Sequence, residues 1–251
     1  MFCASLLSVP YLHAEVDSSL WQTKKYQHFI IYYQEAQDSY VEDLADAAEK
    51  YYNDIVEDLG YRRFDFWSWD NRAKIYLFKD AEGYHADTKR DTWSGAEVNV
   101  RNRTIKTFIG QKNFFDSILP HEMTHIIFRE FIGERTLLPL WVDEGVACSQ
   151  EKTYLAARIR EAKSLLTQGS YVKLKDFSGL TASSLDNPPA FYAQAASIMV
   201  YLIEYSGKDK FLDFSRQLRD GTNWQEALKN IYGFANFEDM EQKWREYTLE
   251  N

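Results

Sequence analysis

The stretch HEMTH at residues 121–125 carries the strongest signal in this chain. Residues four apart on an α-helix lie on one face about a turn apart, so His121 and His125 can reach one metal ion together. Zinc takes histidine nitrogens at roughly 2.0 to 2.1 Å, and Glu122 stands between the two histidines as a candidate general base. Five residues can match by accident, and histidine pairs also occur in ordinary helix cores. The rest of the chain therefore has to decide what the motif means.

A catalytic zinc site usually has three protein ligands and one open position, so a third ligand is required. None of the five histidines lies downstream of the motif, and Phe occupies positions 128 and 131, where a metzincin would need Gly and His. A gluzincin pattern instead takes a glutamate from a second helix. The stretch LPLWVDEG at 138–145 offers Glu144, with 18 residues between it and His125. This spacing and context match the gluzincin pattern.

LPHEMTHIIF followed by LPLWVDEGVA resembles the gluzincin zinc peptidases, specifically the bacterial peptidase MA-like proteins. The likeness continues through NPPAFYAQAASIMVYLIEYSG at 187–207 and covers most of residues 24–248. The resemblance implies a zincin-like α+β fold, one zinc ion and hydrolysis of peptide bonds by a metal-activated water. It also implies that His121, His125 and Glu144 hold the zinc and that Glu122 is the base.

The chain departs from this pattern at position 148. Many gluzincins carry an aspartate four residues after the ligand glutamate, which orients a zinc histidine, whereas this chain has Cys148. The partner of the histidines is therefore open. Asp143 is one candidate, although it equally fits a solvated helix residue, and a small buried thiol is the favoured interpretation of Cys148.

An oxyanion donor is also expected from the helices that follow. Gluzincins commonly use a tyrosine or histidine there, and no histidine exists in that part of the chain. The resemblance points to Tyr192, which we therefore count as a candidate catalytic residue beside Glu122. Packing in an aromatic stripe with Phe191 and Tyr205 explains Tyr192 equally well.

The pattern of apolar residues predicts strands first and helices later. Residues 26–33 are rich in β-branched and aromatic types and predict a strand, and the short apolar run at 73–78 predicts a second, buried strand. Alternation within 93–110 predicts one or two more. Apolar residues at steps of three and four predict a helix over 41–59 that ends at Gly60. Downstream, the periodicity predicts helices at 150–167, 189–206, 208–220, 223–232 and 237–249.

We therefore expect two lobes around a cleft that contains the zinc. Residues 15–150 would form an α/β lobe with a mixed sheet that carries the metal-binding helices, and residues 151–251 a helical lobe. By the resemblance, a strand at Thr104–Ile109 would line the cleft and pair with the substrate backbone. Asn187 is a candidate cap for a helix that starts at Pro188.

Net charge and the first residues of the chain limit the kinds of partner and the cellular compartment that we expect. The net charge of −9, from 38 acidic against 29 basic residues, offers no electrostatic footprint for nucleic acid. Residues 1–14 resemble the remnant of a secretory signal without its basic start, which predicts an exported protein, periplasmic or extracellular; a short element of the fold, and with it a cytoplasmic protein, is the alternative. No segment has the 18 or more apolar residues of a transmembrane helix.

These observations favour an exported zinc metallopeptidase that acts on peptide or protein. Two alternatives stay open. One is a noncatalytic envelope module that keeps the fold and binds a partner, which would not need the base Glu122. The other is a zinc hydrolase of a different amide or ester.

Overall fold

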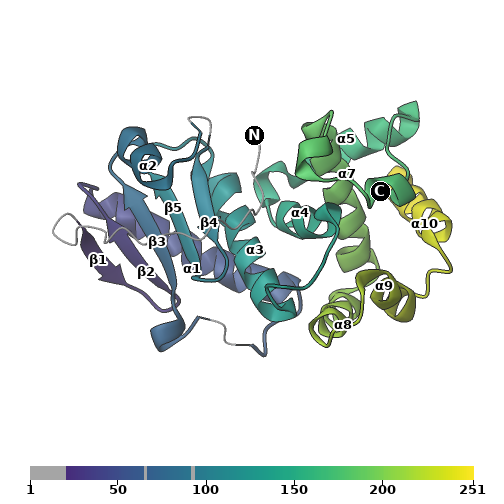
Figure 1. Cartoon of the computed structure of the whole chain (residues 1–251), viewed down its shortest axis with the longest axis horizontal. Coiled ribbons are helices and arrows are strands. Elements are labelled where there is room, and N and C mark those ends of the chain that lie inside the picture. Colours follow the sequence, from purple (N-terminus) through teal and green to yellow (C-terminus); the bar gives the residue numbers. More distant parts are fainter. Residues whose placement is uncertain (1–20, 65–66, 92–93) are drawn as a thin grey trace.

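A five-stranded mixed sheet forms one side of the molecule (Figure 1). The computed structural model describes residues 21–64, 67–91 and 94–251. Along the sheet the strands follow the order β1-β2-β3-β5-β4. Their bounds are β1 Gln22–Lys25, β2 Phe29–Tyr33, β3 Ala73–Phe78, β4 Ala96–Asn99 and β5 Thr104–Phe108.

The sheet has a parallel centre and antiparallel borders. β3 pairs in parallel with β2 and with β5, whereas β1 and β4 run antiparallel to their neighbours. Burial alternates along β2 and β3. Ile31 and Ile75 are fully buried, and the residues next to each of them on its own strand are partly exposed. This period of two gives the sheet one apolar face that needs cover from helices.

One expectation about the sheet is wrong. β5, at Thr104–Phe108, does not offer a free edge to a substrate, because it is hydrogen-bonded to β3 on one side and to β4 on the other. Within the described residues, β4 at Ala96–Asn99 is the border strand on this side. A hairpin folds the chain back, so the strand next to the metal helix in sequence becomes an inner strand of the sheet.

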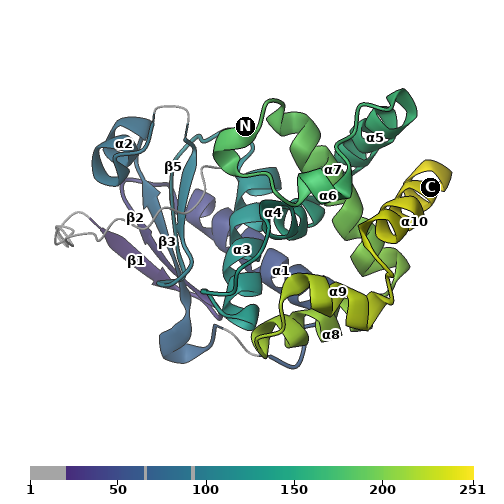
Figure 2. The ribbon, with the colours of Figure 1, turned by 45° about the vertical axis from the view of Figure 1, so that its right-hand side comes forward.

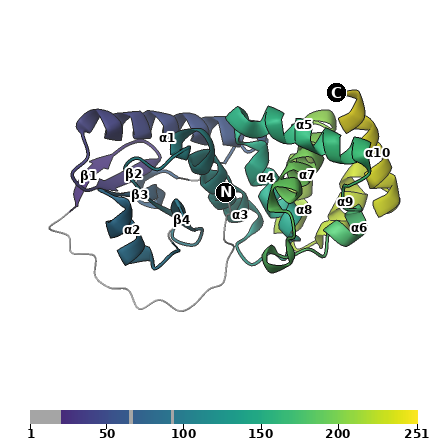
Figure 3. The ribbon, with the colours of Figure 1, turned by 90° about the horizontal axis from the view of Figure 1, so that it is seen from above.

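Helices α1 and α3 cover the apolar face of the sheet. α1 (Asp38–Asp58) runs along the sheet and contacts β2, and α3 (Leu119–Ile132) packs between α1 and β4 (Figures 1 and 3). α2 (Ala81–Thr88) contacts β3 and β5 near their ends. The chain leaves α1 at Gly60, which has a φ of +78°, as the sequence predicts for a helix end.

Helices α5 to α10 form the other side of the molecule, and α3 and α4 lie between them and the sheet (Figure 2). The predicted helical segments are present, but the segment at 189–206 changes to a π-helical turn, η5 (Tyr201–Tyr205), in its last part. The bounds are α4 Leu140–Ser149, α5 Lys152–Gln168, α6 Leu174–Phe177, α7 Pro188–Val200, α8 Lys208–Arg219, α9 Trp224–Tyr232 and α10 Phe237–Glu250. The side chain of Asn187 caps α7 by accepting a hydrogen bond from the backbone N–H of Ala190.

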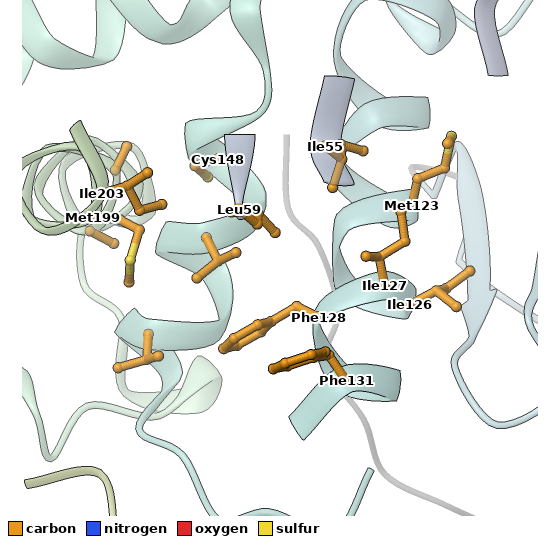
Figure 4. Packing of buried hydrophobic residues seen from close by; sticks show 14 of the residues in the cluster. Ile55, Leu59, Met123, Ile126, Ile127, Phe128, Phe131, Cys148, Met199 and Ile203 are labelled. Atoms are coloured by element: carbon orange, nitrogen blue, oxygen red, sulfur yellow. The ribbon is translucent and has the colours of Figure 1, made fainter. Parts of the chain in front are cut away.

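A continuous apolar core joins the two sides. In Figure 4, Leu59, the residue after α1, and Phe128 of α3 lie between Ile127 of α3 on one side and Met199 of α7 on the other. At Gly145 of α4, an added Cβ would lie only 2.7 Å from the carbonyl oxygen of Ala195 in α7. The two helices therefore touch backbone to backbone, and glycine is required at this contact.

Two expectations lie beyond what the fold can test. Residues 1–14, with the predicted export signal, lie outside the described residues, and the division of the chain at residue 150 stays a prediction. Among the described residues, no helix combines the length and apolarity needed to cross a membrane.

Candidate metal centre

α3 brings the two histidines of the motif onto one buried face. The helix follows a π-helical turn, η3 (Phe114–Ile118), and Pro120 lies in its first turn, where no backbone N–H is needed. His121 is 7 % exposed and His125 is 6 % exposed. Their Nε2 atoms lie 3.1 Å apart.

α4 delivers Glu144 to the same point. Pro139 precedes the helix, and the close α4–α7 contact at Gly145 fixes the depth at which the preceding residue, Glu144, lies. Glu144 is 3 % exposed, and its Oε2 lies 3.4 Å from His121 Nε2 and 3.7 Å from His125 Nε2. The structure thus brings together the three residues that the sequence analysis expects as ligands, and their side chains could hold a metal ion.

These three atoms fit a zinc ion. Ligands at about 2.0–2.1 Å from a tetrahedral ion lie roughly 3.3–3.4 Å from each other, and the observed separations of 3.1, 3.4 and 3.7 Å bracket that value. Within the described part of the chain, Glu144 Oε2 is buried without a hydrogen bond of normal geometry. A buried carboxylate oxygen that faces two imidazole nitrogens is stabilised when a cation lies between them.

Glu151 is the partner of His121, which the sequence had left open. It lies at the junction of α4 and α5, is 1 % exposed, and its Oε1 is 2.9 Å from His121 Nδ1. Its other oxygen accepts a hydrogen bond of 2.6 Å from Ser117 Oγ, and Arg158 Nη2 donates to both oxygens at 2.9 Å. Burial would raise the pKa of Glu151, but His121, Arg158 and Ser117 outweigh it and hold this pKa at about 2.

Asp143 stands behind the other histidine. It is buried, and both of its oxygens accept hydrogen bonds from Arg129, at 3.0 and 2.9 Å, so it is not a solvated residue. Asp143 Oδ1 lies 3.6 Å from His125 Nδ1. Although burial opposes ionisation, His125 and Arg129 keep the pKa of Asp143 far below its usual value.

The charges around the site favour a divalent cation. Four carboxylates and two guanidiniums lie within or directly behind the histidine motif. They belong to Glu122, Asp143, Glu144, Glu151, Arg129 and Arg158. Counted as formal charges, they leave a net −2, which an ion of charge +2 would neutralise. Burial opposes the charge on Glu144, yet the two histidines lower its pKa to about 2, so this oxygen is a charged donor.

Glu122 and Cys148, two other residues that the sequence analysis singles out, are both buried. Glu122 is 6 % exposed on α3, between the two histidines in sequence. Cys148 is fully buried, as expected for a small core thiol, and its Sγ lies 4.0 Å from His121 Nδ1. Burial raises the pKa of this thiol.

Tyr192 lies on α7, beside the arginine that donates hydrogen bonds to Glu151. It is 7 % exposed, and its ring lies edge-on to Phe191, with centroids 5.6 Å apart. The Arg158 guanidinium lies 5.8 Å from the centre of the Tyr192 ring, so one arginine contacts both Glu151 and Tyr192. Tyr205 is not its packing partner, because that residue is 67 % exposed and packs on Tyr201 and Tyr247.

The sequence analysis missed Glu151, Arg158, Ser117 and Arg129. A weak signal existed, since Glu151 follows Glu144 by seven residues, or about two helical turns. α4, however, ends at Ser149, and a bend at Gln150 and Glu151 turns the second of these back toward His121. Only the folded chain shows which side chains meet there.

Comparison with known proteins agrees with this centre. A search of curated proteins gave no significant match. The family model of the peptidase MA superfamily matches residues 71–250, a span that includes α3, α4 and all the helices after them. Because this match covers more than half of the chain and contains the buried histidines and glutamate, the protein belongs to the peptidase MA superfamily.

Proposed function

We propose that this protein is a zinc metallopeptidase of the gluzincin type. The observation that carries the proposal is the convergence of His121 Nε2, His125 Nε2 and Glu144 Oε2 within 3.1–3.7 Å of one another in a buried position. Membership of a peptidase superfamily supports peptide or protein as the substrate. A zinc ion held by these atoms would polarise the scissile carbonyl and activate a water for attack.

The residues of the chain then have separate tasks. Glu122 accepts a proton from the attacking water and passes it to the leaving amine, since a carboxylate next to the ligands can take and return a proton without leaving the site. Tyr192 donates a hydrogen bond to the oxyanion of the tetrahedral intermediate. Arg158, which contacts the Tyr192 ring, restricts the position of that side chain.

The strand that would pair with the backbone of a bound peptide is not β5, as the sequence analysis expects, but its neighbour β4. β5 is paired on both sides, whereas β4 borders the sheet and contacts α3, the helix that carries both histidines. An extended peptide can add to such a border through backbone hydrogen bonds. We propose β4, at Ala96–Asn99, as the strand that a substrate backbone would pair with.

The test is cleavage of a mixed peptide library followed by mass spectrometry. Three samples are compared: the protein with one equivalent of zinc, the protein stripped by a chelator, and the stripped protein with zinc restored. The proposal expects cleavage in the first and third samples only. Zinc bound at one equivalent without any cleavage of peptides or unfolded protein would instead favour the noncatalytic binding module.

A further inference from the structure

A cavity of about 220 Å³ opens where the ends of several helices meet. α1 ends there at Asp58, α4 and α5 meet there, η5 forms one wall, and α8 begins there at Lys208. Figure 3 shows the end of α1 beside the start of α5. We propose that this cavity binds a free amino acid through its ammonium and carboxylate groups. The inference goes beyond the proposed function and does not depend on it, because no residue that lines the cavity is a proposed metal ligand or catalytic residue.

The side chain of Gln150 is the first indication of a ligand. Gln150 follows α4, is only 3 % exposed and lines the cavity. Its Nε2 donates a hydrogen bond of 3.2 Å to Ser149 Oγ, which itself donates to the Val146 carbonyl and so has no proton to return. Among the residues that the structure describes, none donates to the buried Oε1 of Gln150. A buried amide oxygen without a donor costs free energy, so a ligand that donates a hydrogen bond here is favoured.

Glu204 supplies a second acceptor to the same cavity. It belongs to η5, the π-helical turn that continues α7 after Val200. Such a turn holds an extra residue, which changes the direction of the side chains it carries, and π-helical turns occur frequently at functional sites. Within the described ranges of the chain, Glu204 forms no ion pair, whereas the nearby Asp58 is paired with a lysine. An ammonium group carries three N–H donors, which suit the two acceptors Gln150 Oε1 and Glu204.

Two lysines of the cavity suit the opposite charge. Lys152 Nζ lies 2.5 Å from Asp58 Oδ2, and Lys208 Nζ pairs with a carboxylate oxygen of Glu57. Each lysine has three N–H donors and spends only part of them on its ion pair, so donors are left for a carboxylate. Both lysine side chains are about half exposed, which lets them adjust to a ligand. The cavity therefore offers acceptors for an ammonium group and donors for a carboxylate.

This mixture of charges disfavours simple ions. Asp58 and Glu204 would repel a phosphate or another anion, and Lys152 and Lys208 would repel a metal cation. In the described part of the chain, the groups of side chains that could hold a metal all include His121 and lie away from this lining. The two lysines and the two carboxylates of the lining cancel in formal charge. A zwitterion matches both signs at once.

The size and the apolar wall of the cavity narrow the ligand further. Pockets for drug-sized molecules usually have about 300–1,000 Å³, so a cavity of about 220 Å³ suits a smaller molecule. Val200 and Ile203 also line it and are apolar. An aliphatic side chain that covers them would remove apolar surface from water. An amino acid such as leucine combines this side chain with the two charges.

The experiment measures binding of L-leucine to the zinc-free full chain by isothermal titration calorimetry. Zinc is removed first, so that the metal centre cannot hold the carboxylate of the ligand. We expect a millimolar Kd for so small a ligand. 4-Methylpentanoate lacks the ammonium group of leucine and 3-methylbutylamine lacks its carboxylate, while both keep the carbon skeleton. Each should bind at least about tenfold more weakly, because charge-assisted hydrogen bonds are lost.

Two substitutions locate the ligand. Gln150→Met keeps the length of the side chain and removes the acceptor, and Glu204→Gln removes the charge of an exposed residue. Each should raise the Kd of L-leucine by about 10- to 100-fold. Glu161→Gln is the matched control, since Glu161 is exposed on α5 and does not line the cavity, and it should leave Kd unchanged. The melting temperature of each variant, measured alongside, shows whether it folds as the wild type does.

The outcomes decide the inference without reference to catalysis. Weaker binding in Glu204→Gln at a wild-type melting temperature supports it, even where Gln150→Met fails to fold. Wild-type affinity in Glu204→Gln would overturn it, as would equal affinity for the three ligands or no binding of L-leucine at millimolar concentrations. Binding that appears only when zinc is present would assign leucine to the metal centre and would also overturn the inference. Failure of the proposed function would appear instead as an absence of peptide cleavage.

Discussion

Substitution of Gly145 by alanine tests whether the packing of α4 on α7 positions the third ligand. An alanine Cβ at this place would lie 2.7 Å from the carbonyl oxygen of Ala195 and 3.1 Å from its carbon. Normal contacts between carbon and oxygen are about 3.3 Å or longer, so the helices must separate by roughly 0.6 Å. The obstacle is backbone on a buried helix, which has no alternative rotamer to adopt.

The expected magnitude follows from two opposing effects. Overpacking of a buried contact costs about 1–3 kcal/mol, while replacing glycine by alanine inside a helix contributes about 1 kcal/mol in the other direction. Since backbone cannot yield easily, we expect the upper part of that range and a net loss of about 1–2 kcal/mol. For a chain of this size the melting temperature should fall by about 2–8 °C. The zinc Kd should rise as well, because Glu144 is the preceding residue.

Gly83→Ala is the matched control for this prediction. Gly83 also lies in a helix, α2, but an added Cβ there would meet its nearest neighbour at 3.4 Å, an ordinary contact. Calorimetry of zinc-free protein should show the Gly83 variant as stable as the wild type or slightly more stable. Equal stability of the two variants would refute the idea that α4 and α7 touch at Gly145.

Three further predictions concern the site and its support. Glu144→Ala should lower the zinc content measured after dialysis by a large factor, because two protein ligands make a poor site; full occupancy would remove Glu144 from the ligand set. Arg129→Met should cost about 3–5 kcal/mol in denaturant unfolding, because it leaves the buried Asp143 without its cation; a loss within experimental error would show that the pair is not buried as described. Tyr192→Phe should lower kcat by about a hundredfold with zinc content unchanged; wild-type turnover would assign Tyr192 to packing alone.

The local parts of this account could be predicted from the sequence. The spacing of His121 and His125 fixes a shared helix face because a helix repeats every 3.6 residues. Similarly, the short apolar run at 73–78 and the glycine at position 60 mark a strand and a helix end that the structure confirms. The likeness to peptidase MA proteins added Glu144, which no periodicity could have connected to a helix elsewhere in the chain.

The parts that depend on how distant segments meet could not be predicted. β5 lies between β3 and β4 because the chain crosses over and returns as a hairpin, and nothing in residues 104–108 shows which strand borders the sheet. Glu151 faces His121 only because α4 ends at Ser149 and the chain bends there. Arg158 and Ser117 then complete the arrangement from two further elements.

The most direct test of the central claim is the turnover of Glu122→Gln with zinc bound. Glutamine is nearly isosteric with glutamate, so the helix and the ligands stay in place, but it cannot take a proton from the attacking water. With the best peptide from the library as substrate, kcat should fall by about a hundred- to ten-thousandfold at an unchanged ratio of one zinc per chain. A Glu122→Gln protein that retains both its zinc and wild-type turnover would contradict the proposed mechanism.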